Sequence, residues 1–319
     1  MPTPLIVLRE PEIRSLLDPA SCIAAVEQAF TAYATGGAEL PGVIHLDVPE
    51  HRGEIHIKAG HLHGGNWYAC KFASGFPGRN DGVVLTFDAR TGAPAGILFD
   101  GGYLTDLRTA AAGAVAARHL ALPVVHTIAI LGTGIQSRMQ PQLLKSIRPF
   151  GSARIWGRRR EAAEAAAIEI GAEVADTVEA AVDGAQIVVT ATASRSPLVR
   201  AEWLTPGALI IAVGSDGPDK QELDVAVLAQ ADRIVADSLE QCSRLGEIHH
   251  ALDAGVIQPD AVTELGHITS GRAPGRRTPT ELIVCDLTGV GVQDVAAATV
   301  VMQRALARPD LYEKQICNP

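Results

Sequence analysis

The stretch His126-Thr127-Ile128-Ala129-Ile130-Leu131 is followed directly by Gly132-Thr133-Gly134-Ile135-Gln136-Ser137. Its apolar half is typical of a buried strand, and the residues after the glycines begin a helical pattern. In such a unit the first glycine permits a tight turn. The second lets the backbone approach a pyrophosphate, whose oxygens meet the unpaired N–H groups of the helix start. Ser137 replaces the usual third glycine and is small enough to keep helix and strand close. The stretch predicts a Rossmann-type domain that binds a dinucleotide.

The sequence after Pro123 alternates between strands and helices, which indicates βαβ units and a parallel sheet. The expected strands are 126–131, 153–156, 187–191, 208–213, 233–236 and 282–286. The expected helices are 136–147, 160–170, 177–183, 222–230, 247–254, 259–265 and 294–307.

The sequence before Pro123 has a different pattern. A helix is expected over 18–35, with Asp18 as its cap, and an alanine-rich helix over 105–122. Between them, alternating segments separated by Gly and Pro turns indicate strands. These strands are 43–48, 54–58, 67–73, 83–88 and 95–100. The fold class is therefore α/β: a Rossmann-type parallel sheet domain joined to an α+β domain.

Composition favours a folded cytoplasmic enzyme. The 319 residues, 47% of them hydrophobic, suit two domains, and the net charge of −9 disfavours nucleic acid and anionic membranes as partners. No signal peptide or membrane span is expected. The five cysteines form no C-x-x-C motif, so neither a disulfide framework nor a zinc ribbon is expected. His61 and His63 lack acidic or cysteine co-ligands, and we expect no metal site.

Several segments together resemble the ornithine cyclodeaminase/mu-crystallin family. They are Lys71 to Pro77, Asp100 to Ala112, the Gly132 turn, Asp216 to Asp224, and Asp286 to Asp294. The resemblance implies a discontinuous substrate-binding and dimerisation domain, residues 1–122 completed by 305–319, around a Rossmann domain at 123–304. It also implies a homodimer and an enzyme that interconverts an α-amino acid and its α-imine by hydride transfer.

Three residues match the catalytic positions of that family. Lys71 matches the active-site lysine, and its charge could bind the substrate α-carboxylate and activate an imine. Arg108 matches the carboxylate-binding arginine, and its apolar surroundings predict a buried side chain with an anionic partner. Asp216 follows an expected strand end, where α/β sheets bind ligands, and matches the aspartate that exchanges a proton with the substrate nitrogen. A surface lysine, an exposed helix arginine and a turn aspartate are the competing interpretations.

The expected substrate-binding residues depart from the family pattern. His45 stands where the family has a second carboxylate-binding arginine, and His56 where ornithine cyclodeaminase has a glutamate suited to the ammonium group of ornithine. Lys58 lies on the same strand face as His56. Two potentially cationic side chains would repel ornithine, so we expect a neutral or acidic substrate side chain.

The cofactor is expected to be NADP(H), with NAD(H) possible. NAD-specific sheets carry an acidic residue about 20 residues after the glycine turn. This chain instead has Trp156 followed by Gly157, Arg158, Arg159 and Arg160, whose guanidinium groups suit a 2′-phosphate. The full set of expected cofactor-binding residues is Thr86, Arg108, Gly132, Thr133, Gly134, Ile135, Gln136, Gly157, Arg158, Arg159, Thr192, Val213, Gly214 and Gly289.

These features together predict an NAD(P)H-dependent oxidoreductase that acts on a small α-imino or α-amino acid, most simply a ketimine reductase. One alternative is an ornithine cyclodeaminase-type ammonia lyase that recycles its cofactor within each turnover. Another is a low-turnover NADP-binding protein of the crystallin type. The retention of Lys71, Arg108 and Asp216 together argues against the second alternative.

Overall fold

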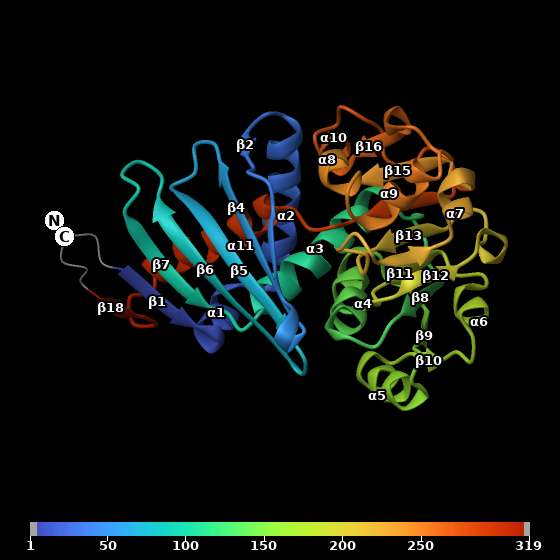
Figure 1. Ribbon diagram of the computed structural model, residues 1–319, viewed down its shortest axis with the longest axis horizontal. Helices are drawn as coiled ribbons and strands as arrows, with labels where there is room; N and C mark the ends of the chain where they lie inside the picture. Colours follow the sequence, from blue (N-terminus) through green and yellow to red (C-terminus); the bar gives the residue numbers. More distant parts are fainter. Residues whose placement is uncertain (1–4, 316–319) are drawn as a thin grey trace. The chain divides into compact units, whose positions relative to one another are not determined.

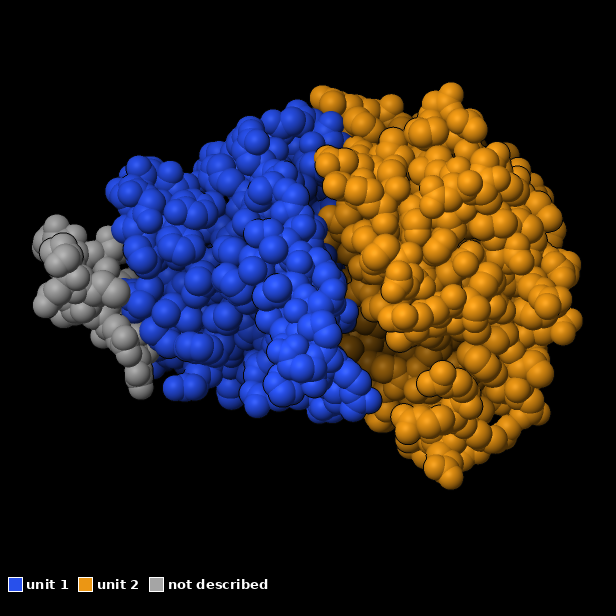
Figure 2. Space-filling model, viewed as in Figure 1, with its two compact units in different colours: residues 1–108, 290–319 blue, residues 109–289 orange. Residues whose placement is uncertain are grey.

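The chain packs into two compact units, as seen in a computed structural model that describes residues 5–315 (Figure 2). Unit 1 comprises Met1–Arg108 and Val290–Pro319, and unit 2 comprises Thr109–Gly289. Residues 1–4, where no signal peptide is expected, and Cys317, one of the five cysteines, lie outside the described residues. The sequence-based limits at 122/123 and 304/305 differ from those of the packed units, because the last helix packs against elements of unit 1.

Unit 1 is built around a mixed sheet with the strand order β18-β1-β7-β6-β5-β4-β2, in which β3 also pairs with β4 (Figure 1). Its strands are β1 (Leu5–Arg9), β2 (Ala38–Glu39), β3 (Ile44–Val48), β4 (Gly53–Leu62), β5 (Trp67–Phe76), β6 (Arg79–Asp88), β7 (Pro94–Phe99) and β18 (Glu313–Gln315). Strands β4, β5 and β6 are each ten residues long and longer than the sequence pattern indicated. The C-terminal strand β18 pairs with β1, so both ends of the chain join this sheet.

The helices of unit 1 cover the face of the sheet that carries the site. They are α1 (Glu10–Leu16), α2 (Pro19–Ala34), the 3-10 turn η1 (Pro49–His51), the first turns of α3 (Tyr103–Leu120), and α11 (Gly291–Leu306). Figure 1 shows α11, in red, beside α2, in blue, and it packs against α2, β4 and β5. Asp18 caps α2 as expected, by accepting from the Ser21 N–H at 2.9 Å. Arg304 of α11 also donates to Asp18, at 2.8 Å.

Unit 2 contains a parallel sheet with the strand order β10-β9-β8-β11-β13-β17-β15-β16. Its strands are β8 (Thr127–Leu131), β9 (Ser152–Trp156), β10 (Glu173–Val174), β11 (Ile187–Thr190), β13 (Leu209–Ala212), β15 (Arg233–Ala236), β16 (Val262–Glu264) and β17 (Ile283–Asp286). The central strands are buried along their whole length, as parallel strands covered on both faces must be. Strand order reverses between β8 and β11, the position at which such sheets bind ligands.

The helices of unit 2 lie between these strands in sequence. They are α4 (Ile135–Ile147), α5 (Arg160–Ile170), α6 (Val178–Val182), α7 (Val225–Gln230), α8 (Leu239–Cys242), α9 (Gly246–Asp253) and α10 (Leu265–Thr269), with η2 (Ala201–Trp203) and η3 (Pro259–Ala261). A small separate sheet pairs β12 (Arg195–Val199) with β14 (Gln221–Leu223).

Three expected helices are wrong in part. The helix expected over 222–230 begins only at Val225, because Gln221–Leu223 forms β14 and Asp224 caps α7. The segment 259–265 is not one helix but η3 followed by β16, which pairs with β15. The last helix begins at Gly291 and not at residue 294, so Asp294 lies in its first turn.

Candidate active site

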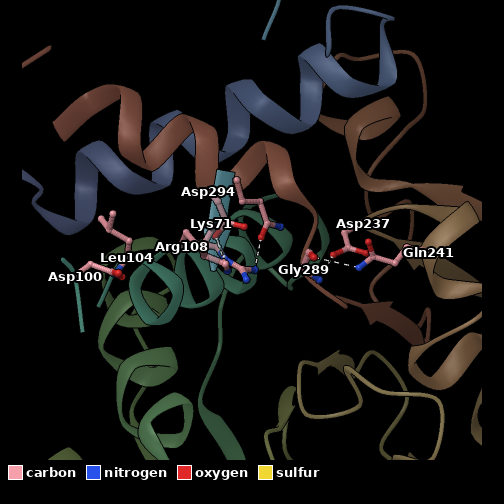
Figure 3. Close-up of polar contacts among 9 residues, drawn as sticks. Lys71, Asp100, Leu104, Arg108, Asp237, Gln241, Gly289 and Asp294 are labelled. Atoms are coloured by element: carbon pink, nitrogen blue, oxygen red, sulfur yellow. Dashed lines mark hydrogen bonds and ion pairs between the residues drawn. The ribbon is translucent and has the colours of Figure 1, made fainter. Parts of the chain in front are cut away.

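The most unusual feature of unit 1 is a fully buried cluster of charged side chains. Lys71 Nζ donates to Asp294 Oδ1 at 2.9 Å, and Arg108 Nε donates to the same oxygen at 3.0 Å (Figure 3). Arg108 Nη1 also donates to Gln293 Oε1 at 2.6 Å. Lys71, Arg108 and Asp294 are 2%, 4% and 3% exposed. The anionic partner that the sequence predicted for Arg108 is therefore present, and it is Asp294.

The sheet register brings a second lysine to this cluster. Lys58 on β4 lies directly opposite Lys71 on β5, and residues opposite each other in neighbouring strands point to the same face. Thr86 on β6 is opposite Ala69, two pairs further along than Lys71 and Val84, so it shares this face. Lys58 is 9% exposed. The strands thus place two lysines on the inner face of the sheet.

Burial and charge shift the pKa values of the cluster in ways that suit ligand chemistry. Desolvation lowers the pKa of Lys71 to about 7, although the Asp294 carboxylate opposes the shift. Desolvation acts to raise the pKa of Asp294, but Arg108, Lys71 and Lys58 outweigh it and hold that pKa below its usual value. Desolvation also raises the pKa of Asp106 to about 6. Asp294 is therefore ionised at neutral pH, and Lys71 can gain or lose a proton there.

Polar atoms without a protein partner lie in the same cluster. Among the described residues, Asp294 Oδ2 and Gln293 Nε2 are buried and have no hydrogen-bond partner. Thr86 Oγ1 has none among these residues either, but it lies against Gly96, further along the sheet. Buried polar atoms are almost always paired, so such atoms need an explanation. A carboxylate acceptor and an amide donor beside two cations are suited to a small ligand that carries both an N–H group and a carboxylate.

The two predicted histidines lie next to each other on β3 and β4. His45 is opposite His56, and their rings meet edge to face at 4.6 Å. Each also approaches a carboxylate: His45 Nε2 is 3.0 Å from Asp47, and His56 Nε2 is 3.8 Å from Glu54. The sequence argument considered only the positive charge that His56 and Lys58 could carry. The structure adds Glu54 and Asp47, which offset part of that charge.

The glycine-rich turn of unit 2 has the conformation that a dinucleotide requires. Gly132 has φ +122°, and a Cβ atom there would lie 2.4 Å from the Ala191 carbonyl oxygen. Gly134 is the N-cap of α4, so no side chain at this position covers the first N–H groups of the helix. A Cβ atom at Gly134 would meet nothing within 4 Å. Ser137 is fully buried against the strand, as expected from its small size. The residues present therefore fit a bound pyrophosphate, because the turn leaves open space in front of a helix N-terminus.

The residues expected to bind the adenosine ribose follow β9. Gly157 is a packing requirement, because a Cβ atom there would lie 2.3 Å from the methyl group of Thr133 in the glycine turn. Arg158 and Arg159 are exposed, and Arg159 is the N-cap of α5. Arg160 instead pairs with Glu164 and Asp176. Two of the three arginines thus remain as candidates for contact with a 2′-phosphate.

The other expected cofactor residues of unit 2 lie beyond the carboxyl ends of its strands, held by buried carboxylates. Glu222 accepts from the N–H groups of Thr192 and Gly214, at 2.6 and 3.1 Å. Asp237 accepts from the Gly289 N–H at 2.6 Å, and Gln241 donates to the Gly289 carbonyl at 3.1 Å (Figure 3). Val213 directly follows β13 and is buried.

Asp216 lies on the loop after β13, as expected, and its side chain is 50% exposed. Lys220 Nζ donates to Asp216 Oδ1 at 2.5 Å. The carboxylate that contacts Lys71 is that of Asp294. Sequence reasoning alone does not single out Asp294, although it lies at the end of a quoted family segment. Its signal is an acidic residue in the first turn of an otherwise apolar helix.

Among the described residues, neither a metal-binding cluster nor a membrane-spanning helix is present. Residues 5–315 contain no group of three or more His, Cys, Asp or Glu side chains that could hold a metal ion. The same residues include no helix long and apolar enough to cross a membrane.

Comparisons with known proteins place the chain among enzymes of one kind. The model of the ornithine cyclodeaminase/mu-crystallin family matches residues 5–308. Putative dehydrogenase RB0419 of Rhizobium meliloti (strain 1021) is 42% identical and covers 96% of this chain and 97% of its own. Iminosuccinate reductase of Paracoccus denitrificans (strain Pd 1222) is 31% identical over 98% of this chain and 100% of its own. The structure of an archaeal alanine dehydrogenase dimer with bound NAD aligns with a TM-score of 0.91 at 33% identity, over 98% of this chain and 99% of its own.

Proposed function

The chain belongs to the ornithine cyclodeaminase/mu-crystallin family, and from that premise we propose that it is an NAD(P)-dependent oxidoreductase that interconverts an α-imino acid and its α-amino acid. The single observation that carries the proposal is the buried Lys71–Asp294–Arg108 cluster. Two cations share one carboxylate oxygen there, so these three groups carry a net positive charge when Lys71 is protonated. A buried surplus of positive charge is costly, and it is relieved when an anionic ligand binds.

Lys71 and Arg108 bind the substrate carboxylate in this proposal. Arg108 uses Nε and Nη1 on Asp294 and Gln293, so it is held rigidly in one orientation. A rigid guanidinium orients a planar carboxylate and brings the substrate α-carbon to a fixed position. Because the pKa of Lys71 is about 7, its ammonium form can also donate a proton close to the substrate. Asp294 opposes the loss of that proton, so Lys71 is about half protonated at pH 7.

Asp216 exchanges the proton at the substrate nitrogen. Its carboxylate is half exposed and lies beyond the carboxyl end of β13, the edge at which parallel sheets bind ligands. The nicotinamide ring, when bound, supplies or accepts the hydride at the α-carbon. The Gly132 turn and the start of α4 would hold the pyrophosphate of that cofactor. Reduction of an imine then needs one proton at nitrogen, and we assign its delivery to Asp216.

The cofactor preference is proposed to be NADP(H) over NAD(H). Arg158 and Arg159 are exposed directly after Gly157, and no acidic residue stands at that position. The archaeal alanine dehydrogenase structure contains NAD, so both NADPH and NADH need to be assayed. Arg158→Ala should lower kcat/KM for NADPH by roughly tenfold, which corresponds to about 1.4 kcal/mol. It should leave kcat/KM for NADH nearly unchanged. A wild-type preference for NADH would contradict this assignment.

The substrate side chain is proposed to be neutral or acidic. Lys58 lies opposite Lys71 and faces the same cluster, which favours a second carboxylate over an ammonium group. The relative named iminosuccinate reductase is consistent with this class. His56 stands beside Glu54, so a weak ornithine activity would trace to that carboxylate.

We also propose a homodimer formed through the outer face of the unit 1 sheet. Ile44, Ile57 and Phe72 lie in one row across β3, β4 and β5, and Leu46 lies opposite Ile55 in the next. Ile44 and Leu46 are more than half exposed, and Phe72 is 37% exposed. Exposed apolar side chains that form a contiguous face often mark an interface. The archaeal relative, described as a dimer, supports a second copy of this chain as the partner.

One substrate panel tests the function. Ornithine, lysine, pyrroline and piperideine carboxylates, and pyruvate or oxaloacetate with ammonia are each assayed for NADPH loss and ammonia release. Imines with neutral or acidic side chains should consume NADPH in proportion to product. Ornithine-dependent ammonia and proline formation without net cofactor use, faster than any imine reduction, would replace the proposal by a cyclodeaminase.

A further inference from the structure

Two adjacent histidines of α9 contact the loop that carries Asp216. His249 Nε2 lies 3.1 Å from the carbonyl oxygen of Pro218, and His250 Nε2 lies 2.8 Å from that of Lys220. The two rings lie close together, with centroids 3.7 Å apart and planes tilted by 41°. Both acceptors belong to the segment 214–220 between β13 and β14. Sequence reasoning gave these histidines no function.

Helix α9 is itself fixed to the sheet, so it is a rigid support for this loop. Asp286 Oδ2, at the end of β17, accepts from the N–H groups of Glu247 and Ile248 at 2.8 and 2.9 Å. Gly246 has φ +78°, and a Cβ atom there would lie 2.4 Å from Asp286 Oδ2. The Glu247 carboxylate accepts in turn from the N–H groups of Glu222 and Leu223. Three polar side chains of α9, those of Glu247, His249 and His250, therefore hold the chain from Pro218 to Leu223.

The two rings differ in the number of backbone carbonyl groups that they contact, two for His249 and one for His250. Carbonyl oxygens can only accept, so each contacting ring nitrogen must carry a proton. His249 Nδ1 also contacts a carbonyl, that of Gly246 at 2.6 Å, so the ring meets carbonyls on both sides. Desolvation lowers the pKa of His250, and its neutral ring needs only the Nε2 proton to reach Lys220. Each ring thus offers the loop one N–H donor.

A chain of contacts leads from the histidines to Asp216. The Lys220 carbonyl that accepts from His250 also accepts from Ser215 Oγ, at 2.6 Å. The Lys220 ammonium group donates to Asp216 Oδ1. Ser215 and Asp216 are neighbours, so both ends of the Asp216 turn are tied to Lys220. Motion of the Lys220 backbone would move the Asp216 carboxylate directly.

We propose that His249 and His250 are positioning residues for Asp216: their Nε2 donors hold the loop 214–220 in the geometry that proton transfer at the substrate nitrogen requires. The role assigned to Asp216 rests on the proposed function, whereas the hold on the loop does not. A displacement of about 1 Å at a reacting group can lower a rate about a hundredfold. Residues that hold the loop by hydrogen bonds can therefore affect the rate without contacting the substrate.

Paired substitutions at each histidine separate this role from a structural one. The amide nitrogen of Gln takes the place of Nε2, and that of Asn the place of Nδ1. His249→Gln therefore keeps a donor toward Pro218, whereas His249→Asn keeps only the donor toward Gly246 within α9. We expect His249→Asn to lower kcat by roughly 10- to 100-fold with little change in KM, and His249→Gln to stay within about threefold of wild type. His250→Gln and His250→Asn should differ in the same direction.

Hydrogen exchange of the cofactor-free protein gives a readout that does not depend on activity. Peptides covering 214–220 should exchange faster in both Asn variants and at the wild-type rate in both Gln variants. His267→Asn, on α10 of the same unit, is the matched control and should leave these peptides unchanged. Equal losses of kcat in Asn and Gln variants, or unchanged exchange in the Asn variants, would overturn the proposal. If no imine is turned over by wild type, the proposed function fails, and exchange alone decides whether the histidines hold the loop.

Discussion

Replacing Asp294 with Asn removes the only carboxylate that contacts both Lys71 and Arg108 among the described residues, and the structure allows the effect to be worked out. At 2.9 and 3.0 Å, each attraction amounts to about 5 to 6 kcal/mol at an effective dielectric near 20, before desolvation costs. About 1.4 kcal/mol corresponds to a tenfold change in proton affinity, so even a quarter of one attraction matters. We expect Asp294→Asn to lower the pKa of Lys71 from about 7 to about 6 or below. At pH 7 the lysine then changes from about half protonated to largely neutral.

Two measurements check this expectation. The chain has only five lysines, so the ¹³Cε resonances of ¹³C-lysine-labelled protein can be followed through a pH titration, with Lys71→Met to identify the signal. Unfolding of Asp294→Asn should also occur roughly 10 °C lower, because breaking a buried ion pair from one side costs about 3 to 5 kcal/mol. In turnover, KM for the imino acid should rise because the carboxylate loses a cation.

The matched control is Asp18→Asn. Asp18 also joins α11 to α2, through Arg304, but its carboxylate is half exposed and does not touch Lys71. This variant should leave the Lys71 titration unchanged. The reasoning is refuted if Asp294→Asn leaves the Lys71 titration where it is in wild type, or if Asp18→Asn shifts it equally.

Three further predictions concern the glycine turn, the kinetic roles and the pH dependence of stability. Gly132→Ala should destabilise the protein, because its Cβ would overlap the Ala191 carbonyl, whereas Gly134→Ala should leave thermal unfolding unchanged and weaken cofactor binding measured by titration calorimetry. Asp216→Asn should lower kcat by about 10² to 10⁴, and Arg108→Ala should mainly raise KM; near wild-type kcat in Asp216→Asn would remove it from the mechanism. Burial raises the pKa of Glu222 to about 7, so the folded protein holds a proton that the unfolded chain has lost, and stability should fall as pH rises from about 4.5 to 7. Glu222→Gln should reduce the fall in the free energy of unfolding in urea between pH 5 and 7.5 by about 3 kcal/mol.

The sequence alone predicts the parallel sheet, the glycine turn and the buried arginine, because each depends on local patterns or on a residue that cannot be buried alone. It does not predict β14 or β16, since three-residue strands carry no periodic signal and form only when a neighbouring strand is in place. Contacts between distant residues also escape it. Asp294 meets Lys71 across 223 positions of sequence, and nothing local at either residue indicates the other.

The contacts of the two histidines of α9 are also not predictable from the sequence. Their sequence context is a short amphipathic helix, in which a histidine pair is most simply a surface feature. Their partners are backbone carbonyls of Pro218 and Lys220, and a backbone acceptor leaves no trace in residue identity. Site residues that act through the backbone of another segment are therefore the hardest to find from one sequence.

The separation between Lys71 and Asp294 also fixes an order of events during synthesis. Unit 2 is one continuous segment, 109–289, and can complete its parallel sheet as soon as it leaves the ribosome. Unit 1 lacks α11 until the whole of unit 2 has been made. Throughout that interval Lys71 and Arg108 have cationic side chains without their shared carboxylate, so the nascent N-terminal sheet stays open to solvent at the future active site. A chain terminated before residue 290 should therefore yield a folded unit 2 beside an incomplete unit 1, the species that chaperones and proteases would meet first.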